Sequence, residues 1–245
     1  MSNFETVIYE KKDGVASVTL NRPHVLNVCN TQMRNELCEV LDAIADDSDV
    51  AVVIFKGAGE KAFCAGADLH DFLKAPSPVV ARQARWQRDL WRKLLTIQSP
   101  LIAALHGYVL GFGVELALCC DIRIAAEDSQ FGLPEVSLGI IPAGGGTQNL
   151  PRTVGLATAL KMTLAGSRLG AAEALNVGLV NQVVPKNRLE LAATRVAEKV
   201  NSFDALAVRY AKQAVVRGLD LPLHAGLALE ARLSGALLRR AIRSG

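Results

Sequence analysis

Glu115 is a carboxylate in the most hydrophobic stretch of the chain. Residues 107–121 read GYVLGFGVELALCCD, and Glu115 follows a Gly-x-Gly by two residues. A buried carboxylate is costly unless it is paired, and burial raises its pKa. Glu115 therefore either meets a distant partner or handles protons.

A second carboxylate, Glu135, has a comparable setting. It follows Leu133 and Pro134 and precedes a loop that contains AGGGT at 143–147. Taken alone, such a glutamate is interpreted as an ordinary surface loop residue. Two glutamates in apolar but unequal settings would suit a reaction that adds or removes water. One can accept a proton from water while the other delivers a proton to carbon.

Two turns rich in small residues could supply hydrogen-bond donors beside these acids. They are AFCAGADL at 62–69 and GFG at 111–113, and each follows an apolar run. Such turns expose backbone N–H groups, and the first N–H groups of a helix are unpaired and partly positive. Together they could form one oxyanion hole. The structural alternatives are a tight turn that needs glycine and a Glu115 that only caps or ion-pairs its helix.

Other chemistries have little support. The sequence contains no G-x-S-x-G elbow, no Walker A loop and no dinucleotide fingerprint. No metal site is predicted, because no histidine has a Cys or Glu at ligand spacing. An odd number of cysteines without a C-x-x-C pair favours a reducing compartment. The N-terminus shows no apolar leader, so we expect a cytoplasmic protein, and an organellar matrix form is compatible with the same features. The histidines and cysteines are His24, His70, His106 and His224, and Cys29, Cys38, Cys64, Cys119 and Cys120.

Composition indicates a globular protein with a large core. The chain has 245 residues, of which 50% are hydrophobic and 21% are charged, and its net charge is +3. This weak basic balance argues against nucleic-acid binding, and the arginines near the C-terminus are interpreted as one solvated helix face. Residues 101–120 are long and apolar enough to resemble a membrane span. Glu115 and the interrupting glycines favour a buried strand and a short helix instead, so no membrane contact is expected.

The order of predicted elements indicates an α/β protein. An Asp13-Gly14 turn joins the first two strands as a hairpin, and Thr31 is the expected N-cap of the first helix. Strands and crossover helices then alternate, and helices dominate after residue 156. We divide the chain into a core at 1–190 and a helical region at 191–245. Strands are expected at 6–11, 15–20, 50–56, 101–105, 121–126, 129–133 and 180–184, and helices at 31–47, 81–98, 114–120, 157–164, 171–176, 189–201, 206–216 and from 223 to the end.

The chain resembles the crotonase superfamily, the enoyl-CoA hydratase/isomerase family, and within it the 2-enoyl-CoA hydratases. The similarity is collinear over almost the whole chain. This resemblance implies a spiral of ββα units, a C-terminal helical region used for trimerisation, and a homotrimer or a homohexamer built as a dimer of trimers. It also implies an acyl-CoA thioester substrate, with coenzyme A as part of the substrate and no separate cofactor. The segments are NRPHVLNVCN (21–30), KAFCAGADL (61–69), HGYVLGFGVELALCCDIRIA (106–125) and FGLPEVSLGIIPAGGGTQNLPR (131–152).

The resemblance also assigns roles by position. Glu115 and Glu135 would hold and activate a water molecule, and the backbone N–H groups of Ala67 and Phe112 would bind the thioester oxygen. Phe112 and Ala143 stand where the family commonly has glycine, so the ring of Phe112 must find room. The substrate-binding positions would be Ala65, Ala67, Asp68, Leu69, His70, Gly113, Pro134, Gly139 and Ala143.

The implied activity is that of a hydro-lyase in lipid metabolism, adding water across the 2,3 double bond of a 2-enoyl-CoA. Both glutamates are present, which is the observation that favours hydration. The alternatives are a Δ3,Δ2-enoyl-CoA isomerase, a hydratase for a branched or cyclic acyl group, and a relative that binds RNA or is not catalytic.

Overall fold

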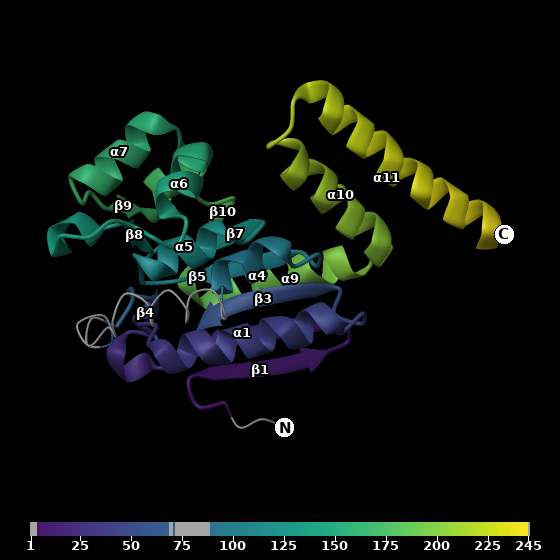
Figure 1. Cartoon of the computed structure of the whole chain (residues 1–245). Coiled ribbons are helices and arrows are strands. Elements are labelled where there is room, and N and C mark those ends of the chain that lie inside the picture. Colours follow the sequence, from purple (N-terminus) through teal and green to yellow (C-terminus); the bar gives the residue numbers. More distant parts are fainter. Residues whose placement is uncertain (1–3, 69–70, 72–88, 245) are drawn as a thin grey trace.

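The larger of two sheets has six strands. The computed structural model describes residues 4–68, 71 and 89–244 (Figure 1). The first two strands form the antiparallel hairpin predicted at Asp13 and Gly14, both of which have positive φ, and every other neighbouring pair is parallel. The order is β1 (Val7–Lys12), β2 (Val15–Leu20), β3 (Val52–Gly57), β5 (Leu101–Leu105), β7 (Ile122–Ala126) and β10 (Gln182–Val184).

The smaller sheet has four short strands, of which the first three are parallel neighbours. The chain alternates between the two sheets, running from β3 to β4, from β5 to β6 and from β7 to β8. A helix follows the last two of these pairs. This alternation is the predicted spiral of ββα units. The strands are β4 (Ala62–Cys64), β6 (Tyr108–Leu110), β8 (Gln130–Gly132) and β9 (Leu169–Gly170).

The helices mostly begin and end within a few residues of the predicted limits. The first helix is an exception at its cap, because Asn30 rather than Thr31 is the N-cap and its Oδ1 accepts the N–H of Met33 at 2.9 Å. Of the helix expected at 81–98, only the part from residue 89 lies within the described residues. The α-helices are α1 (Thr31–Asp46), α4 (Leu90–Thr96), α5 (Phe112–Leu118), α6 (Gly146–Val154), α7 (Leu156–Leu164), α8 (Ala171–Asn176), α9 (Leu189–Asn201), α10 (Ala205–Gly218) and α11 (Leu223–Ser244), and the 3-10 helices are η1 (Pro23–Val25), η2 (Glu135–Leu138) and η3 (Lys186–Arg188).

The larger sheet is buried on both faces, as a central parallel sheet must be. Within β3, Val53 and Phe55 pack into the main core, whereas Val52 and Ile54 pack into a second core under α9. Alternate side chains of a strand point to opposite faces, so an unbroken apolar run results. This explains why VVIF reads as a buried strand without hydrophobic alternation.

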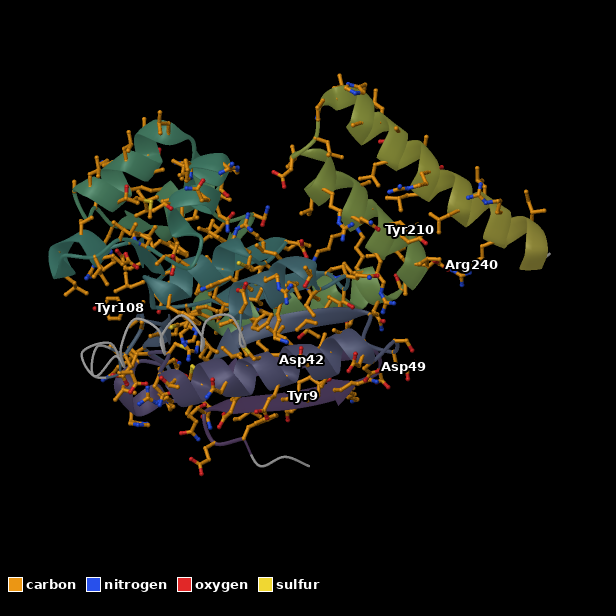
Figure 2. The ribbon with its side chains drawn as sticks, viewed as in Figure 1. Tyr9, Asp42, Asp49, Tyr108, Tyr210 and Arg240 are labelled. Atoms are coloured by element: carbon orange, nitrogen blue, oxygen red, sulfur yellow. The ribbon has the colours of Figure 1, made fainter. Side chains whose placement is uncertain are left out.

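The last two helices form a hairpin that extends away from the sheets (Figure 1). Arg240 of α11 is labelled in Figure 2. Its guanidinium lies 3.2 Å from Oδ2 of Asp204, the N-cap of α10. Arg209 of α10 ties the hairpin to the core through the carbonyls of Ser48 and Val50. Because α9 packs on the larger sheet, the proposed division between residues 190 and 191 falls inside a helix of the core. No helix in the described part of the chain is long and apolar enough to cross a membrane. Residues 101–120 instead contain β5, β6 and α5.

Candidate active site

Three turns of the predicted site meet at one edge of the smaller sheet. Strands β4, β6 and β8 are adjacent and parallel, so their carboxyl ends lie together. The turn 65–68 follows β4, the turn 111–113 follows β6, and Leu133-Pro134-Glu135 follows β8. In parallel sheets, ligands bind beyond the carboxyl ends of the strands. The fold therefore gathers residues that are about seventy positions apart in the sequence.

Gly111 marks the point where the three turns converge. A Cβ atom on Gly111 would lie 2.9 Å from Glu135 Oε1 and 3.5 Å from the Cα of Gly66. Gly111 also has a φ of +51°, which residues with a side chain rarely adopt. Only a residue without a side chain at position 111 thus leaves room between the start of α5, the turn at 65–68 and Glu135.

Glu115 is buried and is held by backbone donors from a distant loop. Its Oε1 accepts the N–H of Gly144 at 2.7 Å and the N–H of Gly146 at 3.0 Å. Gly146 is the first residue of α6, where an N–H group has no acceptor within the helix. Burial raises the pKa of Glu115, and these two hydrogen bonds oppose that shift. Burial outweighs them, so the pKa of Glu115 stays above its ordinary value, and the two donors offset only part of the cost of the buried charge.

Glu135 has a different environment. It is the first residue of η2, and within the described part of the chain its buried Oε2 has no hydrogen-bond partner. Burial is the main cause that raises the pKa of Glu135 to about 7; its own backbone N–H opposes this rise, and the charge of Glu115 adds a smaller one. Backbone donors hold Glu115, whereas burial and the charge of Glu115 favour the protonated form of Glu135, so the two carboxylates differ in how readily they keep a proton.

The N–H of Ala67 is directed away from its neighbouring segment. Cys29 pairs with Ala67 in a parallel bridge, in which the Cys29 N–H donates to the Gly66 carbonyl and the Asp68 N–H donates to the Cys29 carbonyl, both at 2.9 Å. A parallel bridge of this kind uses the groups on either side of Ala67. The N–H of Ala67 itself consequently points to the opposite side.

Phe112 supplies the second predicted donor. It is the first residue of α5, so its N–H has no acceptor within the helix. The side chain is 8% exposed, and its ring lies against that of Trp91 with centroids 5.1 Å apart. The ring is thus accommodated in the core, and the N–H remains at the helix start.

The other predicted residues around these donors differ in their surroundings. Gly113 is buried, and a Cβ there would lie 2.3 Å from the Cys64 carbonyl oxygen, so it permits close contact between α5 and β4. Ala65 donates its N–H to the Leu26 carbonyl at 3.0 Å. Asp68 pairs with Arg22. Leu69 and His70 lie outside the described residues.

The remaining predicted residues flank Glu135 and Glu115. Pro134 precedes η2, and its carbonyl accepts the Ser137 hydroxyl at 2.7 Å. Gly139 ends η2 with a φ of +72°. Ala143 is exposed and directly precedes Gly144. Pro134 is thus next to Glu135, and Ala143 is next to Gly144, whose N–H binds Glu115. Gly139 lies at the surface, four residues after Glu135.

Sequence reasoning missed three residues that surround Glu115. Gly144 and Gly146 donate to its carboxylate. Trp91 packs over Gly144, because a Cβ on Gly144 would lie 2.2 Å from Trp91 Cζ2 and 2.6 Å from Glu115 Oε2. The glycine run before α6 could have been identified by the reasoning applied to GFG. Trp91 has no comparable signal, because its position depends on how α4 packs.

Metal-binding and thiol chemistry have no visible centre here. Among residues 4–68, 71 and 89–244, no group of three His, Cys, Asp or Glu side chains is arranged to hold a metal ion. All five cysteines are free and buried. Burial raises the pKa of the Cys64 and Cys119 thiols to about 12, which keeps both protonated.

Comparisons with known proteins agree with this arrangement. Residues 10–244 match the family described as Enoyl-CoA hydratase/isomerase. A short-chain-enoyl-CoA hydratase of Clostridium acetobutylicum is 42% identical over 230 residues, covering 94% of this chain and 88% of that protein. An (E)-benzylidenesuccinyl-CoA hydratase of Thauera aromatica is 40% identical over 233 residues, covering 94% and 90%. The crystal structure of an enoyl-CoA hydratase from Bacillus anthracis superposes with a TM-score of 0.91 at 39% identity, covering 96% and 92% of the two chains.

Two mixed sheets joined by a ββα spiral and followed by C-terminal helices constitute the crotonase fold. The chain belongs to the enoyl-CoA hydratase/isomerase family.

Proposed function

We propose that the protein is an enoyl-CoA hydratase, which adds water to a trans-2-enoyl-CoA to give a 3-hydroxyacyl-CoA. The observation that supports this most is the unequal pair of Glu115 and Glu135 beside the N–H groups of Ala67 and Phe112. The names of the similar proteins agree, since both curated relatives described above are hydratases of acyl-CoA thioesters.

The two N–H groups would bind the thioester oxygen of the substrate. When hydroxide adds to C3, negative charge moves through C2 to this oxygen and forms an enolate. Fixed donors stabilise this charge more than the neutral thioester, and each such donor is worth ~3 kcal/mol in comparable oxyanion holes. The preceding turns hold both donors before the substrate arrives, so no reorganisation is needed during the reaction.

The environments of the carboxylates assign their roles. Glu115, stabilised as an anion by Gly144 and Gly146, takes a proton from water as its oxygen bonds to C3. Glu135, whose raised pKa keeps a proton near neutral pH, delivers that proton to C2. One proton enters the pair and one leaves it. The reaction therefore ends with the proton on Glu115, and dehydration runs from that state.

Mixing the purified protein with crotonyl-CoA tests this proposal through the loss of the absorbance of the conjugated enoyl thioester. Glu115→Gln and Glu135→Gln should each lower kcat by ~10²–10⁴-fold, the usual contribution of a general acid or base. Glu10→Gln, an equally conservative change of an exposed residue on β1, is the matched control and should keep full activity.

Two results would overturn the proposal. One is that Glu135→Gln keeps near-full hydratase activity. The other is that a 3-enoyl-CoA is converted but no 2-enoyl-CoA with an acyl chain of about four to ten carbons is hydrated. The second result would identify a double-bond isomerase instead.

We also propose that α10 and α11 mediate assembly into a homotrimer or a dimer of trimers. Leu219, which directly follows α10, is 84% exposed, and α11 exposes Leu223 at 79% and Ile242 at 81%. Apolar side chains this exposed in one hairpin are typical of a protein interface. Analytical ultracentrifugation should give a mass of three or six chains. A monomer at micromolar concentration would contradict this.

A further inference from the structure

The turn that contains Ala67 is held by a segment about forty residues earlier in the chain. Besides the two bonds that Cys29 makes across the bridge, the Ala65 N–H donates to the Leu26 carbonyl at 3.0 Å. The N–H of Thr31 donates to Asp71 Oδ2 at 2.6 Å, and the Asp71 N–H donates to the Asp68 carbonyl at 3.1 Å, so the start of α1 is also linked to Asp68. The direction of the Ala67 N–H is therefore set by contacts outside its own turn.

One side chain connects the two segments. Arg22 Nη1 donates to the Val28 carbonyl at 2.7 Å and to Asp68 Oδ2 at 3.1 Å. The side chains of Arg22 and Asp68 are only 16% and 20% exposed, so water screens this ion pair less than it would screen a surface pair. Because Asp68 directly follows Ala67, the guanidinium fixes one end of the donor peptide.

Arg22 is itself fixed by a buried amide. Its N–H donates to Asn27 Oδ1 at 2.9 Å, and Asn27 Nδ2 donates to the carbonyls of Ala58 and Ala62, both at 2.9 Å. Asn27 is 1% exposed and has a φ of +56°, a conformation that asparagine tolerates better than most residues. A continuous set of hydrogen bonds thus runs from β4 through Asn27 and Arg22 to Asp68.

We propose that Arg22 is a positioning residue for catalysis, which holds the Ala67 N–H toward the thioester oxygen by anchoring Asp68. This inference rests on the proposed function. Arg22 acts through Asp68 and does not touch the substrate. A donor that is displaced by a fraction of an ångström still lets the substrate bind but stabilises the enolate less. The effect of losing Arg22 should therefore fall on kcat and leave KM nearly unchanged.

Steady-state kinetics provide the first test. Arg22→Gln and Asp68→Ala should each lower kcat by ~10–100-fold with KM within about threefold of the wild type. Arg22→Lys keeps the charge but loses the planar guanidinium, so its kcat should fall less than that of Arg22→Gln. The double variant Arg22→Gln/Asp68→Ala should have a kcat no lower than that of the less active single variant, because both substitutions remove the same ion pair.

Lys11→Gln is the matched control. It breaks an ion pair with Asp47, whose Nζ–Oδ2 distance is 2.6 Å, at the far end of α1 from Asn30. That helix has 16 residues, so the two ends are ~24 Å apart. This variant should keep the wild-type kcat.

A spectroscopic test separates positioning from general destabilisation. Butyryl-CoA labelled with ¹³C at the thioester carbonyl has no double bond to hydrate, so it can be studied in the complex with the whole protein. Bound to the wild type, its carbonyl stretch should lie at a lower frequency than in solution, because hydrogen bonds polarise the carbonyl. In Arg22→Gln and Asp68→Ala this lowering should be smaller, while the melting temperature changes by only a few degrees.

The outcomes are distinct. If the wild type itself does not lower the carbonyl frequency, the oxyanion hole of the proposed function fails. If the wild type lowers it and Arg22→Gln shows the same lowering with normal kcat, only the role of Arg22 is wrong. A rise in KM with normal kcat would mean that Arg22 contacts the substrate, which also overturns the inference. If both Arg22 variants fail to fold, Asp68→Ala decides the matter by the same two measurements.

Discussion

The indole of Trp91 lies against the ring of Phe112, with centroids 5.1 Å apart and planes inclined at 53°. The same indole covers Gly144, whose N–H holds Glu115. Trp91 thus connects the helix that starts with one predicted oxyanion donor to the loop that orients one predicted acid.

Phe112 allows the ring and the backbone donor to be separated by mutation. Phe112→Ala removes the ring and keeps the N–H, so it should lower the free energy of unfolding by ~3 kcal/mol while kcat stays within about tenfold. Phe112→Pro removes the N–H as well, at the first position of α5, where proline fits a helix. Its kcat should fall a further ~10²–10³-fold. Equal activity in the two variants would show that the Phe112 N–H is not a catalytic donor.

Gly144 should not tolerate a side chain. A Cβ there would lie 2.2 Å from Trp91 Cζ2 and 2.6 Å from Glu115 Oε2, so Gly144→Ala must shift the loop that holds Glu115. We expect kcat to fall on the order of 10–100-fold and the free energy of unfolding to fall by ~1–3 kcal/mol.

Two further variants check that explanation. Gly218→Ala, at the end of α10 with no atom within 4 Å of the added carbon, should be neutral or stabilising. Replacing Trp91 by leucine in the Gly144→Ala background should restore part of the lost stability by making room. If Gly144→Ala keeps wild-type kcat, the loop does not need its present position for catalysis.

The sequence indicated AGAD, GFG and LPE as candidate site segments. Of the strands that precede them, only the one before LPE was expected, at 129–133, whereas β4 and β6 before AGAD and GFG were not. The resemblance to a known family then assigned the roles. The six-stranded order and the pairing of β4, β6 and β8 could not be derived from local pattern, because strands of three residues have almost no periodicity.

Contacts between distant segments were not predictable from the sequence. The link from Arg22 to Asp68 depends on the bridge between Cys29 and Ala67, which no local propensity indicates. The cap of α1 was misplaced by one residue because both Asn30 and Thr31 are good N-caps, and only the Asn30 side chain reaches the Met33 N–H. Local rules identify candidates, and packing selects among them.

The pH dependence of hydration should be bell-shaped, because the pair must hold one proton. Above pH ~7, Glu135 loses its proton, since its pKa is raised to about 7 mainly by burial, and kcat/KM falls. At low pH Glu115 takes up a second proton, at a pKa that burial raises above the usual range of a glutamate. Dehydration should show the same profile, because the overall reaction takes up no proton. Initial rates in both directions across pH test this, and Glu135→Gln should lose the alkaline limb. An alkaline limb that persists in this variant would assign it to another group.

Glu36 should make a contribution to the free energy of unfolding that depends on pH. Its Oε2 accepts the Thr6 hydroxyl at 2.6 Å and the N–H groups of Thr6 and Val7 at 2.9 and 3.0 Å, which ties β1 to α1. Burial raises the pKa of Glu36, but these hydrogen bonds outweigh it and leave the pKa lowered. The stabilisation is therefore complete above the unfolded pKa of ~4.3 and is lost as pH falls through the lower folded pKa. In urea titrations, Glu36→Gln should cost ~2–3 kcal/mol at pH ~7 and less at pH ~3. Glu39→Gln, on the exposed face of the same helix, should cost almost nothing at either pH. A Glu36→Gln cost that stays constant or grows on acidification would mean that the charge of Glu36 is not what holds the strand.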